Sequence, residues 1–312
     1  MKKYLIQTVM NKSVLISFIL LLFSQLVIAK TSYFFLDLDN DIESYSINAY
    51  TLNTKELYNI DKEVILYNIS VNSKGNLHSS QYNNLIILFS VLPTFDESNS
   101  LWIELNDFPS TLDLISFKDL CILAENRILG ANSPYFHPNN YQVITKKNGK
   151  YFKSKNAFVQ FFLIEDLPVE LNVPKSTIQL NQNHISIYEM EKIHDKYNLN
   201  YSPFNPFDYS NLFDNRFERF YLSKKLTIQG MNAYKFWSFK AWNSEIDDLD
   251  WDRGVDRFIY IPGKGIVAAS LDFYFKDPLP KAYPRLPRRA IDNQTFKNNV
   301  ISEKVMLAEE LK

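Results

Sequence analysis

The last third of the chain has the pattern that most constrains the fold. Four strand-like runs follow one another, at residues 217–228, 233–241, 255–261 and 266–276. Short glycine-containing turns join the first pair and the last pair. Consecutive strands with short turns pair antiparallel, so we predict a four-stranded antiparallel meander. In the final run, alternate residues from Leu271 to Phe275 would face the core, and those between them would face solvent.

The first two thirds of the chain mix strands with helices. We predict strands at residues 32–38, 64–71, 111–115 and 157–164, from short apolar and β-branched runs. A hairpin is predicted between residues 141 and 153, because the dipeptide Asn148-Gly149 favours a tight turn with positive φ at both residues.

Three helices are expected in the same region. Leu85, Leu88, Phe89 and Leu92 have the spacing of one helical face, so the sequence predicts a helix over residues 85–92. Ser116 and Asp119 form a capping pair at the start of a second helix, which Gly130 would end. A third helix is predicted over residues 185–197, and a short terminal helix over residues 301–312.

These elements predict an α+β fold, with a mixed N-terminal region that holds a few helices and the C-terminal meander. The predicted boundaries divide the chain into residues 1–29, 30–200, 201–276 and 277–312. Residues 201–213 form an aromatic and proline-containing loop at the first internal boundary, although both regions could belong to one domain. Residues 277–287 are proline-rich and predict an extended tether before the terminal helix.

The first 29 residues have the three parts of a secretory signal. Lys2, Lys3 and Lys12 precede an uncharged apolar run over residues 14–29, which ends in the small residue Ala29. The run is shorter than the roughly 20 residues that cross a bilayer, although an uncleaved anchor remains an alternative. We expect cleavage after Ala29, export to the periplasm or the extracellular space, and no membrane span in the mature chain.

Cysteine content and charge limit the class of protein further. Cys121 is the single cysteine, so no internal disulfide can form, and its apolar neighbours favour a buried side chain over a reactive thiol. The formal net charge is −1 at pH 7, so the chain lacks the excess of basic residues that is typical of nucleic-acid-binding proteins. We therefore expect no nucleic-acid partner.

The segment Glu245–Asp256 is the most suggestive local feature. Asp248, Asp250 and Asp252 alternate as calcium ligands do, but Arg253 occupies the position of the glycine that an EF-hand requires. Calcium binding remains one alternative. The others are a solvated loop whose like charges keep a sheet edge from pairing with other chains, and a loop that contacts a partner. The candidate binding residues, which combine this acidic run with the tryptophans around it, are Trp242, Asp248, Asp250, Trp251 and Asp252.

The sequence lacks the common catalytic and cofactor motifs. The histidines His78, His137, His184 and His194 contain no pair four residues apart, and no nucleophile elbow, phosphate loop or dinucleotide fingerprint occurs. We predict a non-catalytic protein that needs no cofactor.

The function expected from these features is binding to a protein partner. One concrete form is a periplasmic inhibitor or immunity protein that neutralises a toxin or enzyme. Two alternatives stay open: an envelope hydrolase that uses paired carboxylates, and a carrier of a lipid or other apolar ligand on a curved antiparallel sheet.

Overall fold

The computed structural model describes ten stretches of the chain. The expected signal segment, the whole loop at 201–213, residues 239–253 with most of the acidic segment, and the tether at 277–287 all lie outside them. The described residues are 31–38, 44–71, 84–95, 100–107, 112–128, 138–165, 177–196, 220–238, 254–275 and 291–312.

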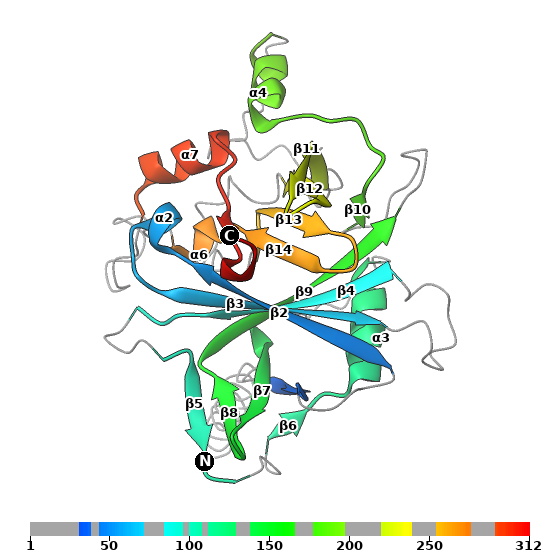
Figure 1. The fold of residues 1–312 in the computed structure, drawn as a ribbon, viewed down its shortest axis with the longest axis vertical. Helices are drawn as coiled ribbons and strands as arrows, with labels where there is room; N and C mark the ends of the chain where they lie inside the picture. Colours follow the sequence, from blue (N-terminus) through cyan, green and yellow to red (C-terminus); the bar gives the residue numbers. More distant parts are fainter. Residues whose placement is uncertain are drawn as a thin grey trace, which may run out of the picture. The chain divides into compact units, whose positions relative to one another are not determined.

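Three five-stranded sheets form the fold, and we name them sheets A, B and C. In Figure 1, sheet B lies between sheet A and sheet C. Sheet B is antiparallel apart from the parallel pair β9 and β10. Its strands, in spatial order, are β10 (Thr177–Gln179), β9 (Asn156–Glu165), β4 (Leu85–Leu92), β3 (Glu63–Val71) and β2 (Tyr45–Asn53).

The predicted helix at residues 85–92 is wrong, because this run is the central strand β4, buried along its whole length. Leu88 packs in the core between sheets B and C, whereas Leu85 and Phe89 pack in the core on the other side. A strand covered on both faces is apolar at nearly every position, so its sequence does not show the alternation of a half-buried strand; in β4 the exception is the buried Ser90. The helical spacing of its leucines was a coincidence of that continuous run.

Sheet A combines parallel and antiparallel pairs. β1 pairs in parallel with both β6 and β7, and β8 pairs antiparallel with β7 and β5. The strands in spatial order are β5 (Trp102–Leu105), β8 (Lys150–Ser154), β7 (Tyr141–Lys147), β1 (Ser32–Leu36) and β6 (Asp113–Leu114). The predicted hairpin is confirmed: Asn148 and Gly149 join β7 to β8 with φ of 52° and 79°.

The helix α3 (Phe117–Ile128) confirms the predicted capped helix over its described length. Ser116 Oγ accepts a hydrogen bond from Asp119 N at 3.1 Å, which satisfies one of the unpaired amides of the first turn. Leu120, Cys121 and Ala124 face the core shared with sheets A and B. The position of the predicted stop, Gly130, is outside the described residues.

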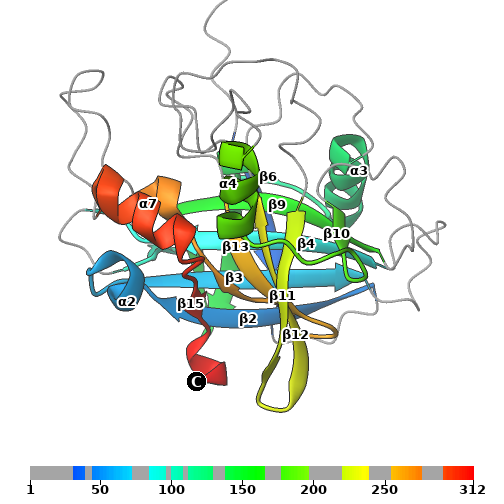
Figure 2. The same cartoon turned by 90° about the horizontal axis from the view of Figure 1, so that it is seen from above.

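Sheet C is the predicted C-terminal antiparallel sheet, with five strands in place of four. The fifth strand, β15, pairs Leu307 with Ala268 of β14 and Met306 with Ala269. Figure 2 shows β11 and β12 extending as a long hairpin at one side of this sheet. The strands are β11 (Phe220–Ile228), β12 (Met231–Ser238), β13 (Arg257–Ile261), β14 (Gly265–Ala269) and β15 (Met306–Leu307).

Two further predictions about the C-terminal region are wrong. The run predicted as a strand to residue 276 ends at Ala269, and α6 (Asp272–Phe275) follows, with Asp272 fully buried instead of facing solvent. Residues 301–312 form no α-helix beyond the last residue of α7 (Asn293–Ile301); they form β15 and the 3-10 turn η5 (Glu309–Leu311). Pairing with β14 decides this conformation, and local sequence does not contain that information.

The remaining described helices are short. α2 (Lys55–Tyr58) connects β2 to β3, and η2 (Pro138–Asn140) precedes β7. α4 (Ile187–Lys196) confirms the helix predicted at 185–197, and Ser186 and Glu189 form a reciprocal capping box at its start.

Two hydrophobic cores join the three sheets. One lies between sheets B and C and draws on residues from Tyr50 to Leu311, so the N-terminal and C-terminal regions share it. The other lies between sheet A, α3 and the opposite face of sheet B. Residues Ser32–Lys312 thereby form one compact unit.

Candidate functional site

The five candidate binding residues, in and next to the acidic segment, lie outside the described residues. Trp242, Asp248, Asp250, Trp251 and Asp252 belong to residues 239–253, which connect β12 to β13. The structure therefore does not test whether they lie together. It does describe both ends of this connection.

The two ends are hydrogen-bonded to each other and to the next strand. Ser238 N donates to Asp256 O at 3.0 Å, and Asp256 N donates to Ser270 O at 3.2 Å. Ser270 N in turn donates to Arg257 O at 2.8 Å. The connection thus leaves sheet C at Ser238 and returns to it at Asp256, and hydrogen bonds among three adjacent backbone segments hold these two ends in place. We call these ends the base of the connection.

Sheet B also contacts the base. Val255 N donates a hydrogen bond to Oε1 of Gln160 in β9 at 2.9 Å. Gly254 has φ of +68°, and a Cβ added there would lie 2.1 Å from Cδ of Gln160. Glycine suits this position, because it adopts positive φ without strain and because an added Cβ would displace the Gln160 side chain from its hydrogen bond.

A buried ionic network lies directly behind the base. Arg257 and Asp272 are both fully buried and form an ion pair between Nη2 and Oδ2. The Tyr58 hydroxyl donates to Asp272 Oδ1 at 3.0 Å and accepts from Leu271 N at 2.6 Å. Burial, followed by the charge of Asp272, raises the pKa of Tyr58 well above its usual value, so this hydroxyl stays protonated.

Arg257 also links the network to the C-terminal segment. Its Nε donates to Lys304 O at 3.2 Å, while Nη1 is buried without a hydrogen-bond partner among the described residues. Burial alone would lower the pKa of Arg257, but the carboxylates of Asp272 and Asp256 outweigh it and the net direction is upward. Arg257 is therefore a permanently charged group inside the protein.

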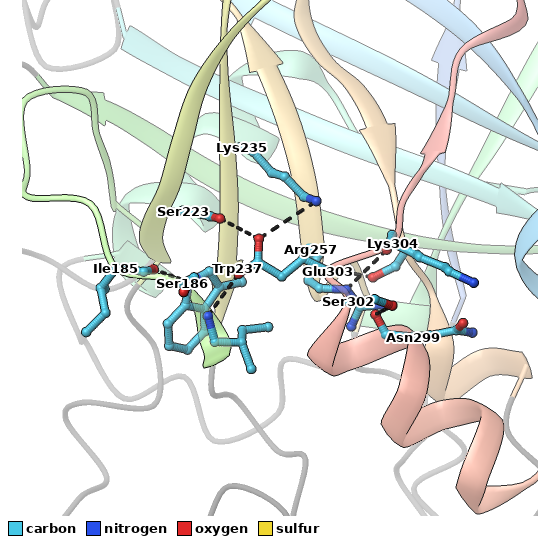
Figure 3. Close-up of polar contacts among 12 residues, drawn as sticks. Ile185, Ser186, Ser223, Lys235, Trp237, Arg257, Asn299, Ser302, Glu303 and Lys304 are labelled. Atoms are coloured by element: carbon cyan, nitrogen blue, oxygen red, sulfur yellow. Dashed lines mark hydrogen bonds and ion pairs between the residues drawn. The ribbon is translucent and has the colours of Figure 1, made fainter. Parts of the chain in front are cut away.

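A second polar cluster surrounds Glu303, as Figure 3 shows. Its carboxylate accepts hydrogen bonds from the Ser223 hydroxyl and, at 2.9 Å, from Ile187 N in the first turn of α4. Lys235 Nζ lies 3.8 Å from Glu303 Oε2. Glu303 thereby connects β11, β12 and the N-terminus of α4, where a negative charge is favourable.

Lys235 is a buried lysine with a strongly lowered pKa. Burial lowers its pKa to about 8, against a raising effect of Glu303 and further lowering by Lys224 and Arg257. A lysine with such a pKa can act as a base or nucleophile. Here Lys235 and Glu303 are each only 8% exposed. The Glu303 carboxylate is already bound by Ser223, Ile187 N and Lys235, so we interpret the cluster as one that holds the C-terminal segment against sheet C.

Sequence reasoning missed both clusters. Their six polar side chains come from α2, β11, β12, β13, α6 and the connection after α7. The only sequence signal was a charged residue within an apolar strand, as for Lys235 in Ala-Tyr-Lys-Phe-Trp and Arg257 in Arg-Phe-Ile-Tyr-Ile. That pattern also fits a residue on the solvated face of a strand, which was the interpretation given to Asp272.

The other candidate groups are less altered. Cys121 is buried at 1% exposure, as predicted, and burial raises its pKa to about 11. His184 is exposed, whereas His78, His137 and the side chain of His194 are outside the described part. Among the described residues, no group of histidine, cysteine, aspartate and glutamate is arranged to hold a metal ion.

Comparison with family models, with curated proteins and with solved structures found no match. None of the described helices is long and apolar enough to span a membrane.

Proposed function

We propose that this chain is an exported binding protein without catalysis of its own, and that it contacts a protein partner through the acidic segment Glu245–Asp256. The observation that supports the proposal is the rigid base of this segment. Connections between paired antiparallel strands usually hold about two to five residues. Here residues 239–253 separate two such strands, and their ends are hydrogen-bonded to each other.

A long connection on a rigid scaffold is the usual form of a binding loop, because the scaffold positions it at little entropic cost. Between Ser238 and Gly254 the chain carries five acids and two bases. Such a segment would steer a basic partner towards the site, and Trp242 and Trp251 would supply the apolar anchors at the contact. A periplasmic inhibitor or immunity protein is the concrete form that we favour.

The hydrolase and carrier alternatives gain no specific support from the described residues. The apolar face of sheet C packs against sheet B, where Phe162, Phe236 and Phe258 fill the core. Glu165 has a pKa raised by burial, but it does not form a pair with a second carboxylate in the described hydrogen bonds.

The experiment is a binding measurement with matched variants. The tagged protein is crosslinked in the envelope of its producing cells, and the partner is identified and purified. We expect the triple variant Asp248→Ala/Asp250→Ala/Asp252→Ala to associate at least about tenfold more slowly at low salt, and to lose most of the salt dependence of association. Trp242→Ala/Trp251→Ala should speed dissociation by about thirtyfold or more, the effect of losing an aromatic anchor.

The control is Glu56→Ala/Asp61→Ala/Glu63→Ala, which removes three exposed acids elsewhere and keeps the net charge equal to that of the test variant. It should bind as the unmodified protein does. If the aspartate variant and the control bind alike, the acidic segment is not the binding site.

A further inference from the structure

Most edge strands of the three sheets have a feature that hinders pairing with another chain. β6, β10 and β15 are only two or three residues long. β11 carries two adjacent lysines and a β-bulge, and β5 carries Glu104, which forms an ion pair with Lys150. Short length, charge and bulges are the usual protections of a sheet edge. The remaining edge strand, β2, has none of them.

β2 is long, uncharged and regular. Its nine residues, Tyr45–Asn53, contain no charged residue and no proline, and they pair with β3 without a register shift. Figure 2 shows β2 as the outermost strand on its side of sheet B. Ser46 and Ala49 lie on opposite faces of the strand and both are exposed, so solvent reaches both faces of this part of β2.

The C-terminal segment covers one end of this edge. Ala308 pairs antiparallel with Leu52. Thr51 N donates to Glu310 Oε1 at 3.0 Å, so the amide of Thr51 points away from β3. The edge of β2 therefore accepts a further antiparallel segment, and Thr51 shows the direction of the backbone groups that do so.

The other end of the edge has no such neighbour. Strand amides alternate in direction, so the N–H and C=O groups of Tyr45, Ile47 and Ala49 point the same way as those of Thr51. In the part of the chain that the structure describes, no hydrogen bond occupies these outward groups. Unpaired groups along an edge are a template for pairing with another strand.

We propose that β2 pairs with β2 of a second copy of this chain, so that the two copies of sheet B form one continuous antiparallel sheet across a twofold axis. With the axis at Ile47, Tyr45 of each copy lies opposite Ala49 of the other, and Ile47 lies opposite its own counterpart. This register is the one that pairs all three outward residues. Most oligomers of a single chain are twofold dimers of this kind.

Charge and side-chain size favour a second copy as the occupant. Because β2 is uncharged, two copies bring no like charges together. Ser46 and Asn48 lie across the axis from each other in this register, and their small polar side chains can form a hydrogen bond between the copies. A basic partner, which the acidic segment would attract, gains no electrostatic advantage from this neutral strand.

The test is the dependence of the oligomeric state on concentration. One pair of short edge segments buries less area than a standard interface, so we expect a dissociation constant in the micromolar range. Sedimentation velocity between about 1 and about 300 µM should show a monomer that converts to a dimer. The chain from Lys30 is used, because Ser32–Lys312 forms one compact unit.

Ala49→Pro removes an amide that points to the second copy and leaves the hydrogen bonds between β2 and β3 intact, as proline does at a sheet edge. By symmetry each dimer loses two hydrogen bonds, so the dissociation constant should rise at least about tenfold.

The matched control is Thr227→Pro. Thr227 is an exposed residue on the edge strand β11. Ile228 and Met231 pair across a two-residue turn, so the amide of Thr227, one residue before, points away from β12. The control should dimerise as the unmodified chain does, and urea unfolding checks that both proline variants are folded.

Two cysteine variants test the register independently of the prolines. Ser46 of one copy lies opposite Asn48 of the other in a pair without backbone hydrogen bonds, which brings the side chains within reach of a disulfide. A mixture of Ser46→Cys and Asn48→Cys chains should therefore crosslink on mild oxidation. Each variant alone should crosslink much less, because identical positions lie diagonally, about 7–8 Å apart. Cys121 is buried and does not compete.

Three results would overturn the proposal: a monomer at every concentration, equal weakening of the dimer by both prolines, or equal crosslinking in the mixture and in the single variants. None of them bears on the acidic segment, so the proposed partner binding is tested separately.

Discussion

Asn68 of β3 and Ile266 of β14 exchange two hydrogen bonds across the interface between sheets B and C. Asn68 Nδ2 donates to Ile266 O at 3.0 Å, and Ile266 N donates to Asn68 Oδ1 at 2.7 Å. Asn68 is fully buried, so the strand supplies the partners that its amide would otherwise find in water. This contact aligns the two sheets within an otherwise apolar core.

Gly265 makes the approach to Asn68 possible. A Cβ there would lie 2.5 Å from Asn68 Oδ1, and the residue has φ of +88°. We expect Gly265→Ala to lower the free energy of unfolding by about 3 kcal/mol or more, from backbone strain and loss of the amide contact. Gly263→Ala is the control, because its φ is +74° with nothing within 4 Å of the added Cβ, and it should cost about 1–2 kcal/mol. Urea unfolding measures both; equal losses would show that the contact with Asn68 is unimportant.

The ion pair of Arg257 and Asp272 should show strong coupling. Arg257→Met or Asp272→Leu leaves a buried charge without its partner, and each should destabilise by about 3–5 kcal/mol. Arg257→Met/Asp272→Leu removes both charges and should cost clearly less than the sum of the single changes. A double-mutant cycle from urea unfolding gives the coupling; additive effects would mean that the pair is not the centre of the network.

Lys235 should make stability increase with pH. Its pKa is lowered from 10.5 to about 8 in the folded protein, so between these values the unfolded chain binds more protons than the folded one. The free energy of unfolding therefore gains a contribution that is fully present above pH 10.5 and is lost as the pH falls through about 8. We expect a rise of order 1 kcal/mol between pH 7.5 and 9.5, and a smaller rise in Lys235→Met. Identical pH profiles for the two proteins would contradict this.

Cys121 should react only when the protein unfolds. Burial raises the pKa of its thiol to about 11, and the side chain is 1% exposed. A thiol reagent at pH 8 should label it at the rate of opening, orders of magnitude more slowly than in urea. Rapid labelling of the folded chain would place Cys121 at the surface.

Local signals in the sequence predicted several elements correctly. The turn at Asn148-Gly149 and the Ser116 cap depend on the residues that form them, so their sequence is sufficient. The antiparallel C-terminal sheet was predicted for the same reason, from short turns between apolar runs. The candidate residues Trp242, Asp248, Asp250, Trp251 and Asp252 stay a prediction, because the structure describes only the ends of their segment.

Three features depended on contacts between distant residues. β4 is apolar on both faces because two sheets cover it, and its sequence alone does not distinguish a strand from a helix. β15 is a strand because it pairs with β14. Glu303 reaches Lys235 and Ser223 only because the C-terminal segment packs on sheet C.

The sequence by itself determined the hairpin turns, the helix cap, the single cysteine and the antiparallel pairing of the C-terminal strands, because each follows from the conformational preferences or chemistry of neighbouring residues. The tertiary structure decided which apolar runs are covered on both faces, which charged side chains are paired in the interior, and which uncharged strand lies at the edge of sheet B. These depend on how the three sheets pack, since burial and charge pairing are set by residues that are far apart in the chain.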